Sequence, residues 1–142
     1  MNLKRIILID DNRVDNLVNR KMLAACGFSS PILIFDNPRE AFQWFCSPEG
    51  SNQDDARSTL VLLDINMPDL SGFDLLSKLE KEHPIGFPDY LILMLTSSSD
   101  IADQIRASNY SRVMGYFHKP LNPTKINQSL LPLLGSLFGK AS

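Results

Sequence analysis

Hydrophobic residues in this chain gather in five short runs, and a segment with helical spacing follows each run. The runs lie at residues 6–10, 31–35, 59–64, 90–96 and 113–117. An apolar run of this length predicts a strand that is covered on both faces of a sheet. The run at 59–64 is the most informative, because it ends in Asp64 and a turn rich in Pro and Gly follows it.

The segments between the runs predict five helices. Val14, Leu17 and Val18 recur at helical spacing after the first strand, and we interpret this row as mostly core. The later helices are expected to begin at the N-caps Asn37, Ser71, Ser98 or Ser99, and Asn122. Pro132 predicts a kink or an early end of the last helix, and the polar stretch Ser47–Ser58 predicts a surface loop.

Strict alternation of strands and helices predicts the α/β class. It favours a doubly wound parallel sheet of five strands, with right-handed crossovers and helices on both faces. With 142 residues, of which 44% are apolar and 21% charged, the chain fits one compact domain with a single core. We therefore expect residues 1–142 to form a single domain.

Charge and cysteine content exclude several classes of function. A net charge of -2, without a long block of Lys or Arg, disfavours binding to nucleic acid or to anionic lipid. The apolar stretch Ile6–Ile9 is too short for a signal peptide or a membrane span, so we expect a cytoplasmic protein. Cys26 and Cys46 have no CxxC spacing and no cluster of His, which predicts reduced thiols.

Polar residues follow the ends of the predicted strands. They are Asp10 and Asp11, Asp64, Thr96 and Ser97, and Lys119 and Pro120. The carboxyl ends of parallel strands meet at one edge, where neighbouring carboxylates repel by about 4 kcal/mol per close pair at an effective dielectric of about 20. Mg²⁺, which prefers oxygen ligands, would relieve this repulsion.

The same groups suit phosphoryl transfer. Asp64 would be the nucleophile that forms an aspartyl phosphate, and Lys119 and Thr96 would bind the phosphoryl oxygens.

Together with Asn66 after Asp64, and Tyr116 three residues before Lys119, these residues resemble the receiver domain of two-component response regulators. The resemblance covers residues 4 to about 135. It implies a flavodoxin-like strand order 2-1-3-4-5. It also implies that Asp64 accepts phosphate from a sensor histidine kinase or a histidine phosphotransfer protein.

The resemblance further implies a role for each site residue. Asp11 and Asp64 would ligate Mg²⁺ with the main-chain carbonyl of Asn66, and Asp10 would act mainly through a bound water. Tyr116 would turn inward when Thr96 moves toward the phosphate. That movement would alter the face made by the fourth helix, fifth strand and last helix, and so signal to a downstream protein effector. We expect a stand-alone switch that catalyses its own phosphorylation and dephosphorylation, rather than an enzyme with a turnover substrate.

Three other functions compete with this interpretation. A haloacid-dehalogenase-type phosphatase needs a second acid at position 66, where this chain has Asn. A flavodoxin-like nucleotide binder needs a Gly-rich or Ser/Thr-rich anion loop after the first strand, whereas Asp10 and Asp11 make this segment acidic. A receiver with a silent site would serve only as a docking module, and the intact set of acids, hydroxyl and lysine argues against it.

Overall fold

The computed structural model describes residues 3–97 and 100–138 of the chain. Its elements are β1 (Arg5–Ile9), α1 (Arg13–Ala25), β2 (Ile32–Phe35), α2 (Pro38–Cys46), α3 (Gln53–Ala56), β3 (Thr59–Asp64), α4 (Gly72–Glu82), β4 (Leu91–Thr96), α5 (Ile101–Ser108), β5 (Val113–His118), α6 (Pro123–Lys125), the π-helical turn η1 (Ile126–Leu130) and α7 (Leu131–Phe138). The strands form one parallel sheet in the order β2-β1-β3-β4-β5. The predicted doubly wound, flavodoxin-like order is therefore confirmed.

The register aligns the carboxyl ends of the strands. Ile9 is level with Leu63 on β3, and Asp64 is level with Leu95 on β4. Thr96, at the end of β4, is level with His118 on β5. The residues that end or follow these strands therefore lie along one edge of the sheet.

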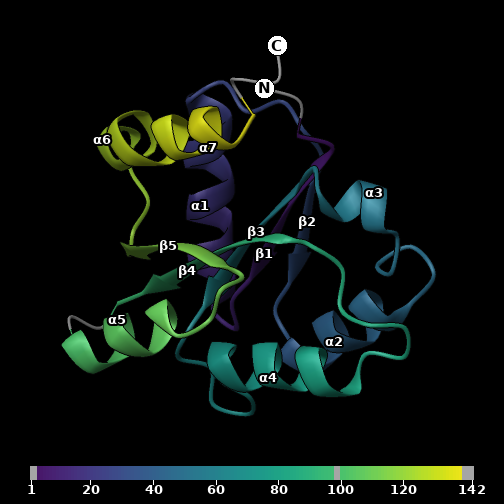
Figure 1. Cartoon of the computed structure of the whole chain (residues 1–142). Coiled ribbons are helices and arrows are strands. Elements are labelled where there is room, and N and C mark those ends of the chain that lie inside the picture. Colours follow the sequence, from purple (N-terminus) through teal and green to yellow (C-terminus); the bar gives the residue numbers. More distant parts are fainter. Residues whose placement is uncertain (1–2, 98–99, 139–142) are drawn as a thin grey trace.

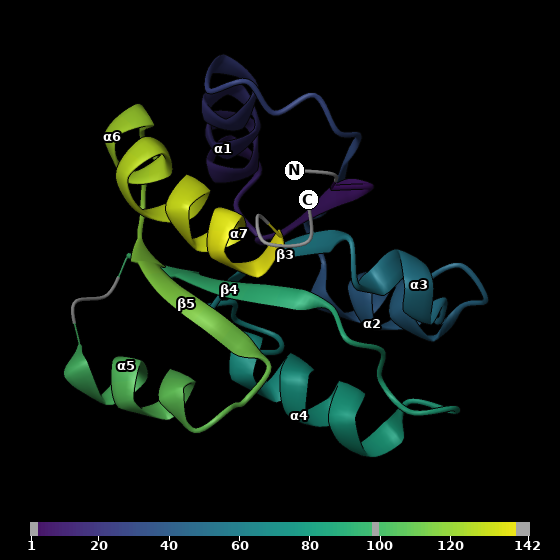
Figure 2. The same ribbon diagram turned by 45° about the horizontal axis from the view of Figure 1, so that its top comes forward.

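Helices cover both faces of the sheet (Figures 1 and 2). Helix α1 and the continuous segment α6–η1–α7 lie on one face, and α2, α4 and α5 lie on the other. Successive residues of β1 alternate between the two layers, so Ile6 and Leu8 pack in one hydrophobic cluster while Ile7 and Ile9 pack in the other. Strands β1 and β3 are buried along their whole length, and they give the acids at their ends a rigid support.

Helix α1 buries only part of the predicted row, in which Val18 is half-buried. Val14 and Leu17, expected to be mostly core, are 66% and 42% exposed. The helix instead buries Asn16, Asn19 and Leu23. Asn16 is drawn inward because its side-chain amide donates a 2.8 Å hydrogen bond to the main-chain carbonyl of Asp10. A polar contact with the end of β1 thus decides which face of the helix is buried.

The stretch Ser47–Ser58 is more ordered than the predicted surface loop, because it contains the short helix α3. Asn52 caps this helix by accepting a 2.9 Å hydrogen bond from the backbone N–H of Asp55. Ala56 is fully buried and packs into the core beneath α2 and α4. Burial of Ala56 therefore anchors this segment, whose composition predicts only a surface loop.

Helix α5 begins later than predicted. Ser98 and Ser99, the expected N-caps, lie outside the described residues. The helix starts at Ile101, and Asp100 caps it by accepting a 2.9 Å hydrogen bond from the backbone N–H of Ala102.

Two outcomes were predicted for the last helix at Pro132, a kink or an early end. The early end is wrong, because the helix does not stop at Pro132. It continues to Phe138, and its irregularity is the π turn η1, in which the N–H of Leu131 bonds to the carbonyl of Ile126. Proline has no N–H to continue the regular ladder, and a π turn is one way for a helix to accommodate such a break. Like the other helices in the described ranges, it does not have the length and apolar character needed to cross a membrane.

Candidate functional site

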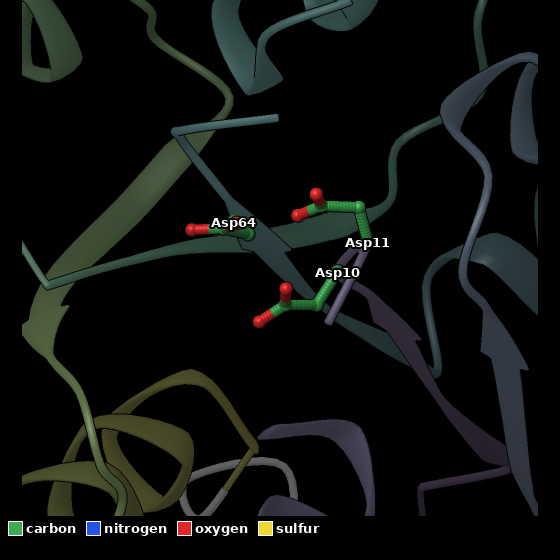
Figure 3. A group of neighbouring side chains, drawn as sticks. All are labelled: Asp10, Asp11 and Asp64. Atoms are coloured by element: carbon green, nitrogen blue, oxygen red, sulfur yellow. The ribbon is translucent and has the colours of Figure 1, made fainter. Parts of the chain in front are cut away.

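Three aspartates meet where β1 and β3 end, and we call them the acidic cluster. Asp10 and Asp11 follow β1, and Asp64 is the last residue of β3. One carboxylate oxygen of each lies within 4.8 Å of the others, and Figure 3 shows the side chains reaching into a common space. Asp10 and Asp64 are buried, whereas Asp11 is exposed. The structure therefore brings together the three acids that the sequence singled out.

Lys119 adds a half-buried cation to the acidic cluster. Its Nζ lies 2.6 Å from Oδ2 of Asp10 and 3.2 Å from Oδ1 of Asp64. The peptide bond to Pro120 is cis, and the N–H of Lys119 donates to the carbonyl of Thr96 at 2.8 Å, which ties the loop after β5 to the end of β4. Burial by itself would lower the pKa of Lys119, but the hydrogen bond with Asp10 and the charge of Asp64 raise it above its ordinary value. The lysine is therefore a permanent positive charge.

Asp64 has a perturbed pKa because it is buried beside another acid. Burial and then the charge of Asp10 raise the pKa of Asp64 from 3.8 to about 6, although Lys119 opposes the shift. The carboxylate is still mostly ionised at neutral pH and can act as a nucleophile. An additional cation would favour the ionised form further.

Asn66 connects Asp64 to the hydroxyl of Thr96. The side-chain amide of Asn66 donates to Oγ1 of Thr96 at 3.2 Å. The backbone N–H of Asn66 reaches Oδ1 of Asp64 at 3.4 Å. Thr96 is fully buried at the end of β4, and Asn66 links its hydroxyl to Asp64.

Tyr116 lies on β5, on the far side of β4 from Asp64. Its hydroxyl oxygen is buried and makes no hydrogen bond of normal geometry to the described residues. The ring packs edge-on against His118, with centroids 5.8 Å apart. Burial and the charge of Asp103 raise the pKa of Tyr116, while Thr96 opposes the shift. The hydroxyl therefore stays protonated and lies inside the protein, near Thr96.

The turn after β3 approaches Asp64 so closely that glycine is required at position 72. A Cβ on Gly72 would lie 2.4 Å from the main-chain oxygen of Asp64 and 3.0 Å from Cε of Met94. The N–H of Gly72 donates to the carbonyl of Ile65 at 2.9 Å, and Ser71 caps the helix that follows. The Pro/Gly turn seen in the sequence therefore packs directly against the main chain of Asp64.

Two residues at the site were missed by the sequence analysis. Asp15, in the first turn of α1, accepts a 3.0 Å hydrogen bond from Nζ of Lys119. Lys125 donates to the carbonyls of His118 and Pro120, at 2.8 and 3.2 Å, and so clamps the chain on both sides of Lys119. Asp15 gave a signal that was overlooked, since it is an acid in the first turn of a helix that starts just after an acidic pair. Lys125 gave none, because its contacts depend on the path of the loop.

The acidic cluster fits a hard divalent cation. It offers only carboxylate oxygens, and burial and the charge of Asp10 raise the pKa of Asp64 although Lys119 lies beside it. Mg²⁺ takes oxygen ligands in octahedral geometry and usually keeps several waters. The exposure of Asp11 leaves room for those waters.

The fold and the cluster define a flavodoxin-like α/β domain with an acidic site at the carboxyl edge of its sheet. The sequence matches the response regulator receiver domain over residues 6–131. The chain therefore belongs to the response regulator receiver domain family. Members of this family are phosphorylation-dependent switches of two-component systems.

Known proteins agree with this assignment. The probable methanogenesis regulatory protein FilR2 of Methanothrix harundinacea is 26% identical over 118 residues, which cover 82% of this chain and 72% of that protein. The chemotaxis protein CheY1 of Helicobacter pylori is 24% identical over 132 residues, which cover 93% of this chain and 98% of CheY1. A two component response regulator from Cytophaga hutchinsonii superposes with a TM-score of 0.76 at 22% identity, covering 95% of this chain and 99% of that chain.

Proposed function

We propose that Asp64 is the phosphoacceptor of a Mg²⁺-dependent receiver. The observation that carries the proposal is that Asp64 combines three properties at one strand end. It belongs to the acidic cluster, its Oδ1 lies 3.2 Å from the Lys119 ammonium, and Asn66 links it to the Thr96 hydroxyl. A nucleophile, a cation site and phosphoryl-binding groups thus lie together.

The donor is a phosphohistidine of a sensor histidine kinase or a histidine phosphotransfer protein. An oxygen of Asp64 attacks the phosphorus, the P–O bond forms as the P–N bond breaks, and the imidazole leaves and takes up a proton. Lys119 and Thr96 bind the phosphoryl oxygens, because charge neutralisation and positioning supply most of the catalysis in such transfers. The same groups position a water for hydrolysis of the acyl phosphate.

Asp11, Asp64 and the main-chain carbonyl of Asn66 would hold the cation, and Asp10 would contribute mainly through a bound water. Bound Mg²⁺ supplies charge neutralisation of the phosphoryl oxygens. Asp10 and Asp64 also orient Lys119, which leaves the ammonium beside the place where the phosphoryl group forms.

The output is a change of surface at α5, β5 and the start of the last helix. Thr96 moves toward the phosphoryl group and stabilises Tyr116 in the inward position that its buried hydroxyl already occupies, so a charge event biases a two-state element. The altered face binds a downstream protein effector in the cytoplasm. The histidine-bearing donor docks over α1, where Val14 and Leu17 are exposed beside the site.

The test is the intact mass of the protein after incubation with Mg²⁺ and a small phosphodonor such as acetyl phosphate. The wild type should gain one phosphoryl group, and Asp64→Asn should gain none. Asp69→Asn serves as a matched control, because Asp69 is an exposed acid in the same turn, and it should gain the group like the wild type. No gain in the wild type would support a silent docking module, and an equal gain in Asp64→Asn would place the chemistry elsewhere.

A further inference from the structure

We propose that Asp15 is a positioning residue of the site, which acts on the cation-binding cluster through Lys119. It holds the ammonium from the side of α1 and offsets its charge, so that the acidic cluster can accept a divalent cation beside a lysine. The proposal rests on the proposed function, because it concerns the same cation site.

The contacts of Lys119 carry the inference. An ammonium group has three N–H donors, and Nζ of Lys119 has three carboxylate partners, at 2.6 Å from Asp10, 3.0 Å from Asp15 and 3.2 Å from Asp64. Two of these partners belong to the acidic cluster, whereas Asp15 does not. Asp15 is therefore the one carboxylate partner of the lysine that lies outside the acidic cluster.

A lysine inside a cation site is a competitor of the cation. Positive charge next to Asp10 and Asp64 repels a divalent ion and occupies the same carboxylates. Asp15 weakens this competition through the lysine, since its charge offsets that of the ammonium and its oxygen takes one of the three ammonium donors. Without Asp15, the ammonium of Lys119 would pair only with Asp10 and Asp64 and would compete more strongly with the cation.

The first turn of α1 holds Asp15 in place. Its backbone N–H donates to the side chain of the N-cap Asn12 at 3.0 Å. An acid at this position also stabilises the helix itself through the helix dipole, so a control must separate the two effects. Helix α4 offers one, because Asp74 is likewise its third residue, with its N–H donating to the N-cap Ser71 at 3.1 Å. No ion pair of Asp74 is found among residues 3–97 and 100–138.

The experiment is a calorimetric titration with Mg²⁺ of the wild type, Asp15→Asn and Asp74→Asn. Because Asp15 is part-exposed, its loss should raise the Mg²⁺ dissociation constant by about 3- to 10-fold. Asp74→Asn should change it by less than about twofold, since an exposed charge away from the lysine has little effect. Thermal unfolding of each variant verifies that it is folded under the conditions of the titration.

A second pair of proteins tests whether the effect passes through the lysine. In a Lys119→Met background, adding Asp15→Asn should change the dissociation constant by less than about twofold, because the coupled partner is gone. Equal effects of Asp15→Asn and Asp74→Asn would overturn the proposal, and so would the same fold-change with and without Lys119. If the wild type binds no Mg²⁺, both the proposed cation site and the role of Asp15 are wrong. This outcome can be told apart from the two above, in which the wild type still binds Mg²⁺.

Discussion

The surroundings of Asp64 determine its pKa. It is buried at the end of β3, and burial and Asp10 raise its pKa to about 6 while Lys119 opposes the rise. A proton and a cation therefore compete for the same carboxylate, and the affinity for Mg²⁺ should fall as the pH drops below about 6. The pKa of Asp64 is thus set by its burial at the end of β3 and by the opposing charges of Asp10 and Lys119.

The raised pKa of Asp64 predicts that Asp64→Asn stabilises the metal-free protein. Because the folded state binds the Asp64 proton more tightly than the unfolded chain, stability falls as the pH rises from about 4 to about 6 and is not regained above it. The shift from 3.8 to about 6 corresponds to at most about 3 kcal/mol, since one pKa unit equals about 1.4 kcal/mol. In urea denaturation with a chelator, the variant should gain about 1 to 3 kcal/mol at about pH 7.5 and less at about pH 5. A loss of stability, or a gain that does not depend on pH, would contradict this cause.

The start of α4 lies very close to the end of β3 at this site. The turn into α4 lies against the carbonyl of Asp64, where a Cβ on Gly72 would meet it at 2.4 Å. Gly72→Ala should therefore cost about 1 to 3 kcal/mol in unfolding free energy and slow phosphorylation, because the end of β3 must shift. Gly135→Ala is the control, since Gly135 lies within α7 with open space at its Cβ position, and it should be neutral or stabilising by up to about 1 kcal/mol. Equal losses in both variants would show that the approach at Gly72 is not the cause.

The start of the last helix holds the loop after β5 in place through hydrogen bonds. Lys125 donates to two carbonyls that flank Lys119, and Lys125→Met keeps the length of the side chain while removing both hydrogen bonds. We expect a loss of about 0.5 to 1.5 kcal/mol by urea denaturation, the usual contribution of an intramolecular hydrogen bond. Lys81→Met, an exposed lysine on α4, should stay within about 0.5 kcal/mol of the wild type. If the two lysine variants are equally stable, the clamp contributes nothing measurable.

These elements also show how far the sequence can predict the structure. The five strands, their order and the acids at their ends could be predicted, because buried parallel strands are apolar runs and polar residues stand out where they stop. The buried face of α1 could not, because Asn16 and Asn19 lie inside while Val14 and Leu17 lie outside. Burial of an asparagine needs a partner, and the partner of Asn16, the carbonyl of Asp10, is defined only once the helix has packed on the sheet. Pattern alone therefore predicted the helix correctly and the burial of Val14 and Leu17 incorrectly.

Across the whole molecule, the site and the proposed output face are joined through β4 and β5. Exposed apolar side chains lie on that face at Ile101, Ile105 and Met114, with exposed fractions of 67%, 59% and 38%. Thr96 and Tyr116 lie between them and Asp64. A change at the carboxylate therefore has a short path to a surface suited to protein contacts.

Tyr116→Ala tests this path. The variant should still accept the phosphoryl group, because Tyr116 lies outside the acidic cluster, but it should no longer transmit the change. Methyl NMR signals of Ile101, Ile105 and Met114, recorded with Mg²⁺ and with or without beryllofluoride as a phosphoryl mimic, report on the face. They should move in the wild type and stay in place in the variant. Equal movements in both proteins would remove Tyr116 from the switch.

The central claim is that the phosphoryl group forms on Asp64, and chemical mapping tests it most directly. After incubation with Mg²⁺ and acetyl phosphate, borohydride reduces an aspartyl phosphate to homoserine, which peptide mass spectrometry locates along the chain. The account predicts homoserine at position 64, only in the sample that received the phosphodonor. Homoserine at position 10 or 11, or none at any position although the intact mass shows the phosphoryl group, would contradict it.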